Sequence, residues 1–188
     1  WIAAQHVVDA LRNRPSNPNP VANWQWTRKL GKQDNAIWVL AEKLNTGLRW
    51  ASYELLGKAR ELAEKLNSEV VGILLGETSR EDLAMLSAYG ADRIYIFRNL
   101  PGVHPISPSW AHSLAQAIED RHPYALLVSS TSNGRDLASR VSARLGVGLT
   151  GDCIDLEIDD QGQLVQLKPA LGGNVVAPIL SRTTPNMA

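Results

Sequence analysis

Cysteine is nearly absent from this sequence, which holds one, Cys153, among 188 residues. A single thiol excludes an internal disulfide, a Cys-x-x-Cys redox pair and a cysteine-rich metal site, and it fits a reducing, intracellular setting. As a nucleophile Cys153 is poorly placed, because its acidic neighbours Asp152 and Asp155 raise the pKa of a thiol. A small buried residue is the favoured role, and an enzyme using this thiol is the weakest alternative.

An excess of charge of one sign is also missing. Nineteen lysines and arginines balance 19 aspartates and glutamates, so there is no electrostatic case for a nucleic-acid partner or an anionic membrane surface. Apolar runs such as VVGILLG, residues 70–76, have the length of a strand. None approaches the roughly 20 residues that span a bilayer, so we expect no membrane insertion.

Familiar catalytic and metal-binding patterns are lacking as well. No Gly-x-Ser-x-Gly nucleophile elbow occurs. The four histidines are His6, His104, His112 and His122. They fall in separate elements, and none has a carboxylate or cysteine at the spacing of metal ligands. On the residues alone, the sequence indicates a binding or assembly domain without a catalytic or metal site.

The first 34 residues differ in character from the rest. Residues 1–14 can form a short amphipathic helix, and three prolines then fall within residues 15–20. Proline removes a backbone donor and restricts the residue before it, so regular structure is not expected there. Trp24 and Trp26 are expected to rest on the chain's own domain. We predict an N-terminal helix or tail and a Pro-rich linker over residues 1–34.

From residue 36 onward, apolar runs of strand length alternate four times with segments of helical period. The expected strands are residues 36–42, 69–76, 91–97 and 124–130, and the expected helices are residues 52–67, 79–90, 110–122 and 134–146. Ser79 and Asp82 have the spacing of a capping box. This alternation predicts an α/β fold, a mostly parallel, doubly wound sheet with right-handed crossovers, in one domain over residues 35–188.

After Gly148 the period changes to two. Ile154, Leu156 and Ile158 alternate with acidic residues, as in a half-buried strand. Residues 159–162, DDQG, predict a hairpin turn to a return strand, and one more short strand follows. We expect these antiparallel strands at the C-terminal edge of the sheet.

The loop SSTSNGR, residues 129–135, is the candidate ligand site. It follows the fourth strand and precedes a helix, where ligands bind in open α/β sheets. Free amides and the helix dipole there favour an anion. The side chains and backbone groups that would hold a phosphate are Ser130, Thr131, Ser132, Asn133, Gly134 and Arg135.

An ordinary helix cap is the other interpretation of this loop. Asn133 as N-cap, with Asp136 three residues on, would satisfy the free amides, and a carboxylate in the first turn repels phosphate. The loop matches neither the P-loop pattern nor Gly-x-Gly-x-x-Gly. We favour the cap, which would leave Arg135 free to point outward toward a subunit interface.

Several stretches also occur in a characteristic order. They are IWVLAE, ELLGKARELAEKL, VVGILLG, YGADRIYIF, SSTSNGRDLASRVSARLGVGLTGDC, LEIDDQGQLVQLKPALGGN and the terminal PNMA. The most specific part runs from Thr131 to Cys153 and continues with GGN and PNMA. Over residues 37–188 the chain resembles the electron transfer flavoprotein alpha subunit, whereas residues 1–35 depart from it.

The resemblance implies an α/β domain related to nucleotide alpha-hydrolases and universal stress proteins, without a cofactor of its own. In the family a second domain holds FAD and begins just after the segment that PNMA resembles. The chain would then be the N-terminal structural and assembly domain of an alpha subunit, an electron carrier fragment without a catalytic site. FAD is expected in the full-length protein and none in this chain.

The partners implied by the resemblance are the electron transfer flavoprotein beta subunit and, through the heterodimer, dehydrogenases and an electron acceptor. The location would be cytoplasmic, or the mitochondrial matrix in a eukaryote. The alternative is a free-standing nucleotide-binding domain of the universal-stress-protein type, which would need phosphate affinity in residues 129–134.

Two further expectations concern packing. Trp38 lies in a fully apolar run and should be buried in a central strand. No stretch left over from the sheet and its helices is expected to build a pocket large enough for a flavin.

Overall fold

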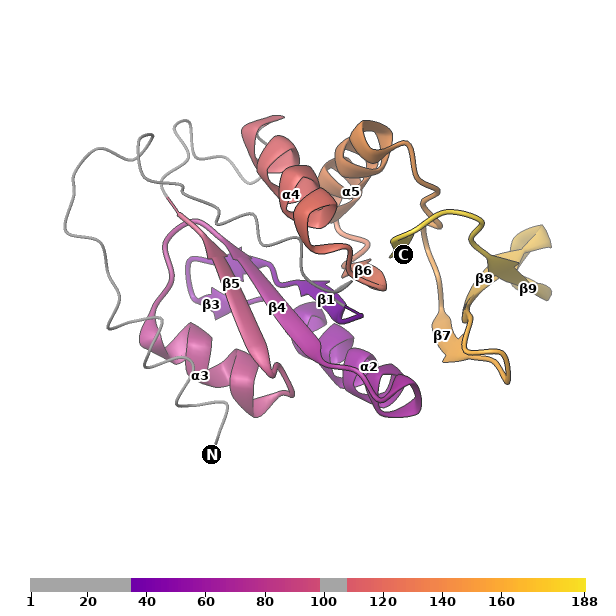
Figure 1. The fold of residues 1–188 in the computed structure, drawn as a ribbon, viewed down its shortest axis with the longest axis horizontal. Coiled ribbons are helices and arrows are strands. Elements are labelled where there is room, and N and C mark those ends of the chain that lie inside the picture. Colours follow the sequence, from indigo (N-terminus) through magenta and orange to yellow (C-terminus); the bar gives the residue numbers. More distant parts are fainter. Residues whose placement is uncertain (1–34, 99–107) are drawn as a thin grey trace.

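The computed structural model describes residues 35–98 and 108–188 (Figure 1). The predicted tail and linker of residues 1–34, with Trp24, Trp26 and His6, lie outside these ranges, as does His104. The other two histidines, His112 and His122, lie within them.

A five-stranded parallel sheet forms the centre of the fold, in the order β10-β6-β1-β4-β5. Its strands are β1 (Ile37–Leu40), β4 (Val70–Leu75), β5 (Arg93–Phe97), β6 (Ala125–Val128) and β10 (Asn186–Met187). Every residue of β1 and β6 is buried. Strands covered on both faces need apolar side chains on both sides of the pleat, which explains their continuous apolar runs.

Helices cover both faces of this sheet (Figure 1). On one face lie α2 (Trp50–Leu66) and α3 (Arg80–Ala88), and on the other lie α4 (Pro108–Arg121) and α5 (Ser132–Leu145). The doubly wound α/β fold that the sequence predicts is therefore confirmed.

Two local predictions are also confirmed. Trp38 is fully buried in β1 on the face covered by α4 and α5, and its ring meets that of Tyr95 edge-on at 5.5 Å between centroids. At the start of α3, the Asp82 amide donates to Ser79 Oγ at 3.1 Å, while the Ser79 amide donates to the Asp82 carboxylate at 2.9 Å. This reciprocal pair is the expected capping box.

The strand order reverses between β1 and β6. From β1 the chain moves to β4 and β5 on one side and then returns to place β6 on the other side of β1. The helices that follow β1 and β6, α2 and α5, lie on opposite faces of the sheet. The carboxyl ends of these two strands therefore border the crevice where open α/β sheets bind ligands.

The C-terminal strands pair in antiparallel fashion as predicted, and they form a sheet of their own. It has the order β7-β8-β9 and consists of β7 (Asp155–Ile158), β8 (Leu164–Ala170) and β9 (Val175–Leu180), with the short 3-10 helix η1 (Leu171–Gly173) between the last two. The predicted turn at residues 159–162 is present, with Gly162 at a φ of 76°.

The edge of the central sheet is taken by β10, which pairs in parallel with β6. The sequence did not predict this strand, because two residues carry no recognisable period. The same reason applies to the small hairpin of β2 (Lys43–Leu44) and β3 (Gly47–Leu48), which connects β1 to α2.

Candidate functional site

The start of α5 is capped by Thr131. Its Oγ1 accepts a hydrogen bond from the Gly134 amide at 3.0 Å, and the helix begins at Ser132. The prediction of Asn133 as N-cap is wrong, because the chain becomes helical two residues earlier and puts Asn133 inside the first turn. Asp136 does not cap either, since its carboxylate accepts from Arg140 Nε at 2.7 Å.

A carboxylate from another strand lies against this helix start. Glu42 lies two residues after the end of β1, and its Oε1 accepts a hydrogen bond from the Thr131 hydroxyl. The Glu42 side chain is 11% exposed and pairs on its other side with Arg49 Nε at 3.1 Å. The electropositive end of α5 is therefore next to a nearly buried negative charge of the same chain.

Gly134 permits this close approach. A Cβ atom at Gly134 would overlap the carbonyl oxygen of Ser129 and would lie 3.0 Å from Glu42 Oε1. Only a residue without a side chain fits between the end of β6, the first turn of α5 and the Glu42 carboxylate.

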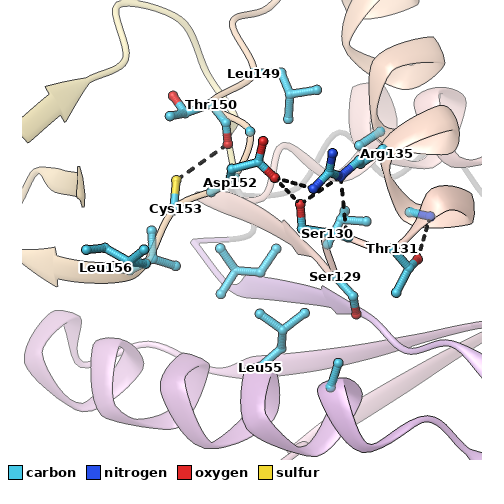
Figure 2. Close-up of a pocket in the computed structure, with 18 of the residues that line it drawn as sticks. Leu55, Ser129, Ser130, Thr131, Arg135, Leu149, Thr150, Asp152, Cys153 and Leu156 are labelled. Atoms are coloured by element: carbon cyan, nitrogen blue, oxygen red, sulfur yellow. Dashed lines mark hydrogen bonds and ion pairs between the residues drawn. The ribbon is translucent and has the colours of Figure 1, made fainter. Parts of the chain in front are cut away.

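A second carboxylate engages the outer part of the loop. Asp152 Oδ1 accepts from Ser130 Oγ at 2.6 Å and from Arg135 Nη2 at 2.6 Å (Figure 2). The hydrogen bond from Ser130, together with the positive charges of Arg135 and Lys168, holds the pKa of Asp152 below its ordinary value. Arg135 is 60% exposed but paired, so the prediction that it is free is wrong. Its place at a subunit interface stays a prediction.

The six candidate residues thus fall into three groups. Ser130 and Arg135 meet Asp152, and Thr131 and Gly134 meet Glu42. The remaining two, Ser132 and Asn133, form the first helical turn. Sequence reasoning missed both carboxylates, since Glu42 precedes Thr131 by 89 positions and Asp152 follows Ser130 by 22.

A cavity of about 710 Å³ opens beside this loop (Figure 2). Its walls come from α2, the end of β6, the first turns of α5 and residues 149–156. The expectation that no such pocket remains is wrong. Because the C-terminal strands form a separate sheet, residues 149–156, which lead to it, leave a space between themselves and α2. The volume is within the range of small-molecule sites.

The residues of this cavity do not fit a nucleotide phosphate. Its two cationic side chains are already paired, Arg135 with Asp152 and Lys58 with Glu61 and Asp155 at 2.7 and 2.9 Å. A phosphate of AMP or FAD would have to displace a carboxylate from each, and Glu42 lies where the helix dipole would bind it.

Nucleophilic and metal chemistry find no support in the described part of the chain. Cys153 is half-buried, and burial and the negative charge of Asp152 raise its pKa against the opposing effect of Lys168, so the thiol is protonated at neutral pH. Residues 35–98 and 108–188 hold no group of three or more His, Cys, Asp or Glu side chains that could bind a metal ion. Among the same residues, no helix is long and apolar enough to cross a membrane.

The fold is a doubly wound α/β domain, and the loop at its switch point is engaged by two carboxylates of the same chain, Glu42 and Asp152. The chain matches the electron transfer flavoprotein domain over residues 37–188, and it belongs to the electron transfer flavoprotein family.

Within that family the chain is similar to alpha subunits, as the resemblance of its motifs indicates. It is 38% identical over 154 residues to the electron transfer flavoprotein subunit alpha of Clostridium acetobutylicum, covering 81% of this chain and 46% of that protein. It is also 38% identical over 145 residues to the corresponding subunit of Megasphaera elsdenii, with coverages of 77% and 43%. A third relative is subunit LctC of the NAD(+),ferredoxin lactate dehydrogenase of Acetobacterium woodii. It is 36% identical over 148 residues, which cover 79% of this chain and 35% of that subunit. The chain spans less than half the length of these relatives.

Proposed function

We propose that this chain is the N-terminal domain of an electron transfer flavoprotein alpha subunit and acts in assembly, as part of an electron carrier without a catalytic site of its own. The observation that carries the proposal is the start of α5, where Glu42 and Asp152 hold the groups that would otherwise bind phosphate. Such a domain has kept the nucleotide-binding architecture but not the charge balance of a nucleotide site.

The cofactor of the complex is proposed to be FAD, bound outside these 188 residues. Flavin supplies the redox chemistry in such proteins, and the protein supplies binding, orientation and electrostatic tuning. The coverage of the relatives supports this assignment, since more than half of each matched alpha subunit lies outside the alignment. The partner is proposed to be the beta subunit, with dehydrogenases as donors and a separate acceptor. A cytoplasmic location is part of the same proposal, supported by the single cysteine.

Calorimetric titration with AMP, ADP and FAD separates this proposal from the free-standing nucleotide-binding domain. We expect no binding by the unaltered chain at ligand concentrations up to about 1 mM, the weak end of the usual affinity range. The double variant Glu42→Gln/Asp152→Asn removes both negative charges while keeping the shape of the side chains. We expect it to gain measurable affinity for the phosphate-containing ligands.

A stoichiometric, tight complex of the unaltered chain with AMP or ADP would overturn the proposal and favour the nucleotide-binding alternative. The matched control is Asp136→Asn, which removes a charge from the same helix at a side chain that pairs with Arg140. This variant should behave as the unaltered chain.

A further inference from the structure

The face of the central sheet that α4 and α5 cover holds a second, smaller cavity. It lies beside β5, the edge strand of the sheet, and its volume is about 140 Å³. Trp38, Tyr95 and Phe97 contribute aromatic walls, and Ala117 and Arg121 of α4 line the other side. The volume is well below the range of sites for drug-sized ligands, so only a small molecule fits.

The wall of this cavity contains a buried donor without an acceptor. Trp38 is fully buried, and its indole Nε1–H has no hydrogen-bond partner among the residues that the structure describes. Buried tryptophan N–H groups usually find a partner, because an unpaired one costs free energy. A water molecule needs about two to four polar partners, and a wall that is mostly aromatic and aliphatic offers it few. A ligand with an apolar body and one acceptor suits this cavity better than water does.

Arg121 supplies a positive charge at the same place. Its guanidinium lies over the Tyr95 ring, with Cζ 5.5 Å from the ring centroid, and Trp38 meets that ring at 5.5 Å between centroids. The neighbouring cation Arg93, 5.9 Å from the Tyr95 centroid, pairs with Glu69 at 2.7 Å. No carboxylate of residues 35–98 or 108–188 forms an ion pair with Arg121. Its charge is therefore available to a ligand, unlike the cations of the larger cavity.

The negative groups of α4 do not cancel this charge. Glu119 and Asp120 precede Arg121 in the helix but are not part of the cavity wall, and Asp120 accepts from Gln116 Nε2 at 3.4 Å. The carbonyl groups at the C-terminal end of a helix disfavour an anion, and Arg121 offsets them because it lies in the last turn. A charged acceptor makes a stronger hydrogen bond than a neutral one and also gains from the cation, so the cavity favours an anion.

We propose that this cavity binds a short-chain monocarboxylate, a molecule such as propionate with one carboxylate and a small alkyl group. The carboxylate accepts from Trp38 Nε1 and pairs with Arg121, and the alkyl group fills the space between the aromatic rings. The site shares no residue with the cavity beside the start of α5. It involves neither phosphate nor flavin, so it goes beyond the function proposed above and does not depend on it.

The indole N–H signal of Trp38 in a heteronuclear NMR spectrum of the 188-residue chain reports on this donor directly. The chain has six tryptophans, and the signal that is lost in Trp38→Phe identifies the one of interest. Titration with sodium propionate at constant ionic strength should shift this signal downfield until it saturates, because the N–H gains an acceptor. We expect a Kd of about 1 mM, a realistic affinity for a ligand of about five non-hydrogen atoms. Propionamide has the same shape without the charge and should bind at least about threefold more weakly.

Two arginines in corresponding positions provide a matched pair of variants. Arg121 lies in the last turn of α4 and Arg144 in the last turn of α5. Arg121→Gln should weaken propionate binding at least about threefold, whereas Arg144→Gln should leave the Kd unchanged. Circular dichroism verifies that both variants are folded. If Arg121 served only to stabilise the end of α4, Arg121→Gln would lower the melting temperature without changing the Kd for propionate, and that result would overturn the proposal.

Three further results would also overturn it. The first is a Trp38 signal that stays in place at about 100 mM propionate, about a hundred times the expected Kd. The second is equal affinity for propionate and propionamide, which would remove the role of the charge. The third is an equal loss of affinity in Arg121→Gln and Arg144→Gln, which would indicate an effect of net charge alone. None of these results bears on the function proposed above, since the nucleotide titrations test that function separately.

Discussion

Gly134 lies in a tight space between the end of β6, the first turn of α5 and the Glu42 carboxylate. The contacts at this point decide the chemistry of the loop. Thr131 accepts from the Gly134 amide and donates to Glu42, so one hydroxyl both caps the helix and holds the carboxylate in place. The positive end of the helix is neutralised inside the protein, and an external anion gains little from it.

Replacement of Gly134 by alanine should therefore destabilise the domain. The new methyl group would overlap the Ser129 carbonyl oxygen, which belongs to the backbone and cannot rotate away. We expect a loss of about 1–3 kcal/mol in the free energy of unfolding, the usual cost of overpacking. Gly57→Ala is the matched control, since a Cβ there meets nothing within 4 Å. In the interior of α2 that change should stabilise by about 0.5–1 kcal/mol. Equal effects of the two substitutions in urea unfolding would show that Gly134 is not confined as described.

Asp82 makes the stability of the domain depend on pH. Burial alone would raise the pKa of this carboxyl, but its ion pair with Lys43 and its bonds to Ser79 outweigh burial and lower it. The folded state then binds a proton less readily than the unfolded state. The stabilisation is complete above the unfolded pKa of about 3.9 and is lost as the pH falls through the lower, folded pKa.

Asp82→Asn should therefore cost about 0.5–2 kcal/mol at pH 7, the typical range for a helix cap. The difference from the unaltered chain should stay constant from pH 7 to about pH 5 and shrink below about pH 4. Urea unfolding curves over this range measure it, with Glu81→Gln, an exposed neighbour in the same turn, as control. A difference that grew as the pH fell would contradict the sign of the pKa shift.

At the scale of elements, local periodicity predicted the four long strand–helix pairs and the capping box of α3, because these depend on residues close in sequence. Two kinds of feature were not predicted correctly. β10 and the β2–β3 hairpin are too short to show a period. For the cap of α5 the usual pattern favours Asn133 with Asp136, whereas the backbone turns helical after Thr131. The loop holds several residues that could cap the helix, and Thr131, the one that does, also bonds to Glu42. Glu42 is far away in the sequence, so the local pattern could not reveal this contact.

The cap of α5 can be located by comparing two substitutions. Thr131→Ala removes the acceptor of the Gly134 amide and the donor to Glu42, and it should cost about 0.5–2 kcal/mol of stability. Asp136→Ala removes only the exposed pair with Arg140, so its effect on stability should be much smaller than that of Thr131→Ala. Thr131→Ser keeps the hydroxyl and should retain most of the stability. Thermal unfolding in which Asp136→Ala is the more damaging change would favour a cap at Asn133 instead.

For the whole molecule, the fold class and the family followed from the sequence, while the state of the candidate site did not. The carboxyl ends of β1 and β6 meet only because the strand order reverses there, and this brings Glu42 to a loop 89 positions away. The cavity beside the loop was missed for the same reason, since it exists only because residues 149–156 lead to a separate sheet. The cavity is large enough for a small ligand, but its two cationic side chains, Arg135 and Lys58, are already paired with carboxylates.

We propose that this chain holds no nucleotide or flavin of its own and takes part in electron transfer by assembling with protein that does. The most direct test is the absorption spectrum of the purified 188-residue chain, followed by chromatography of its acid extract. We predict no band near about 450 nm, the region of an oxidised flavin, and no stoichiometric AMP or FAD in the extract. A yellow preparation, or an extract with one nucleotide per chain, would contradict the account.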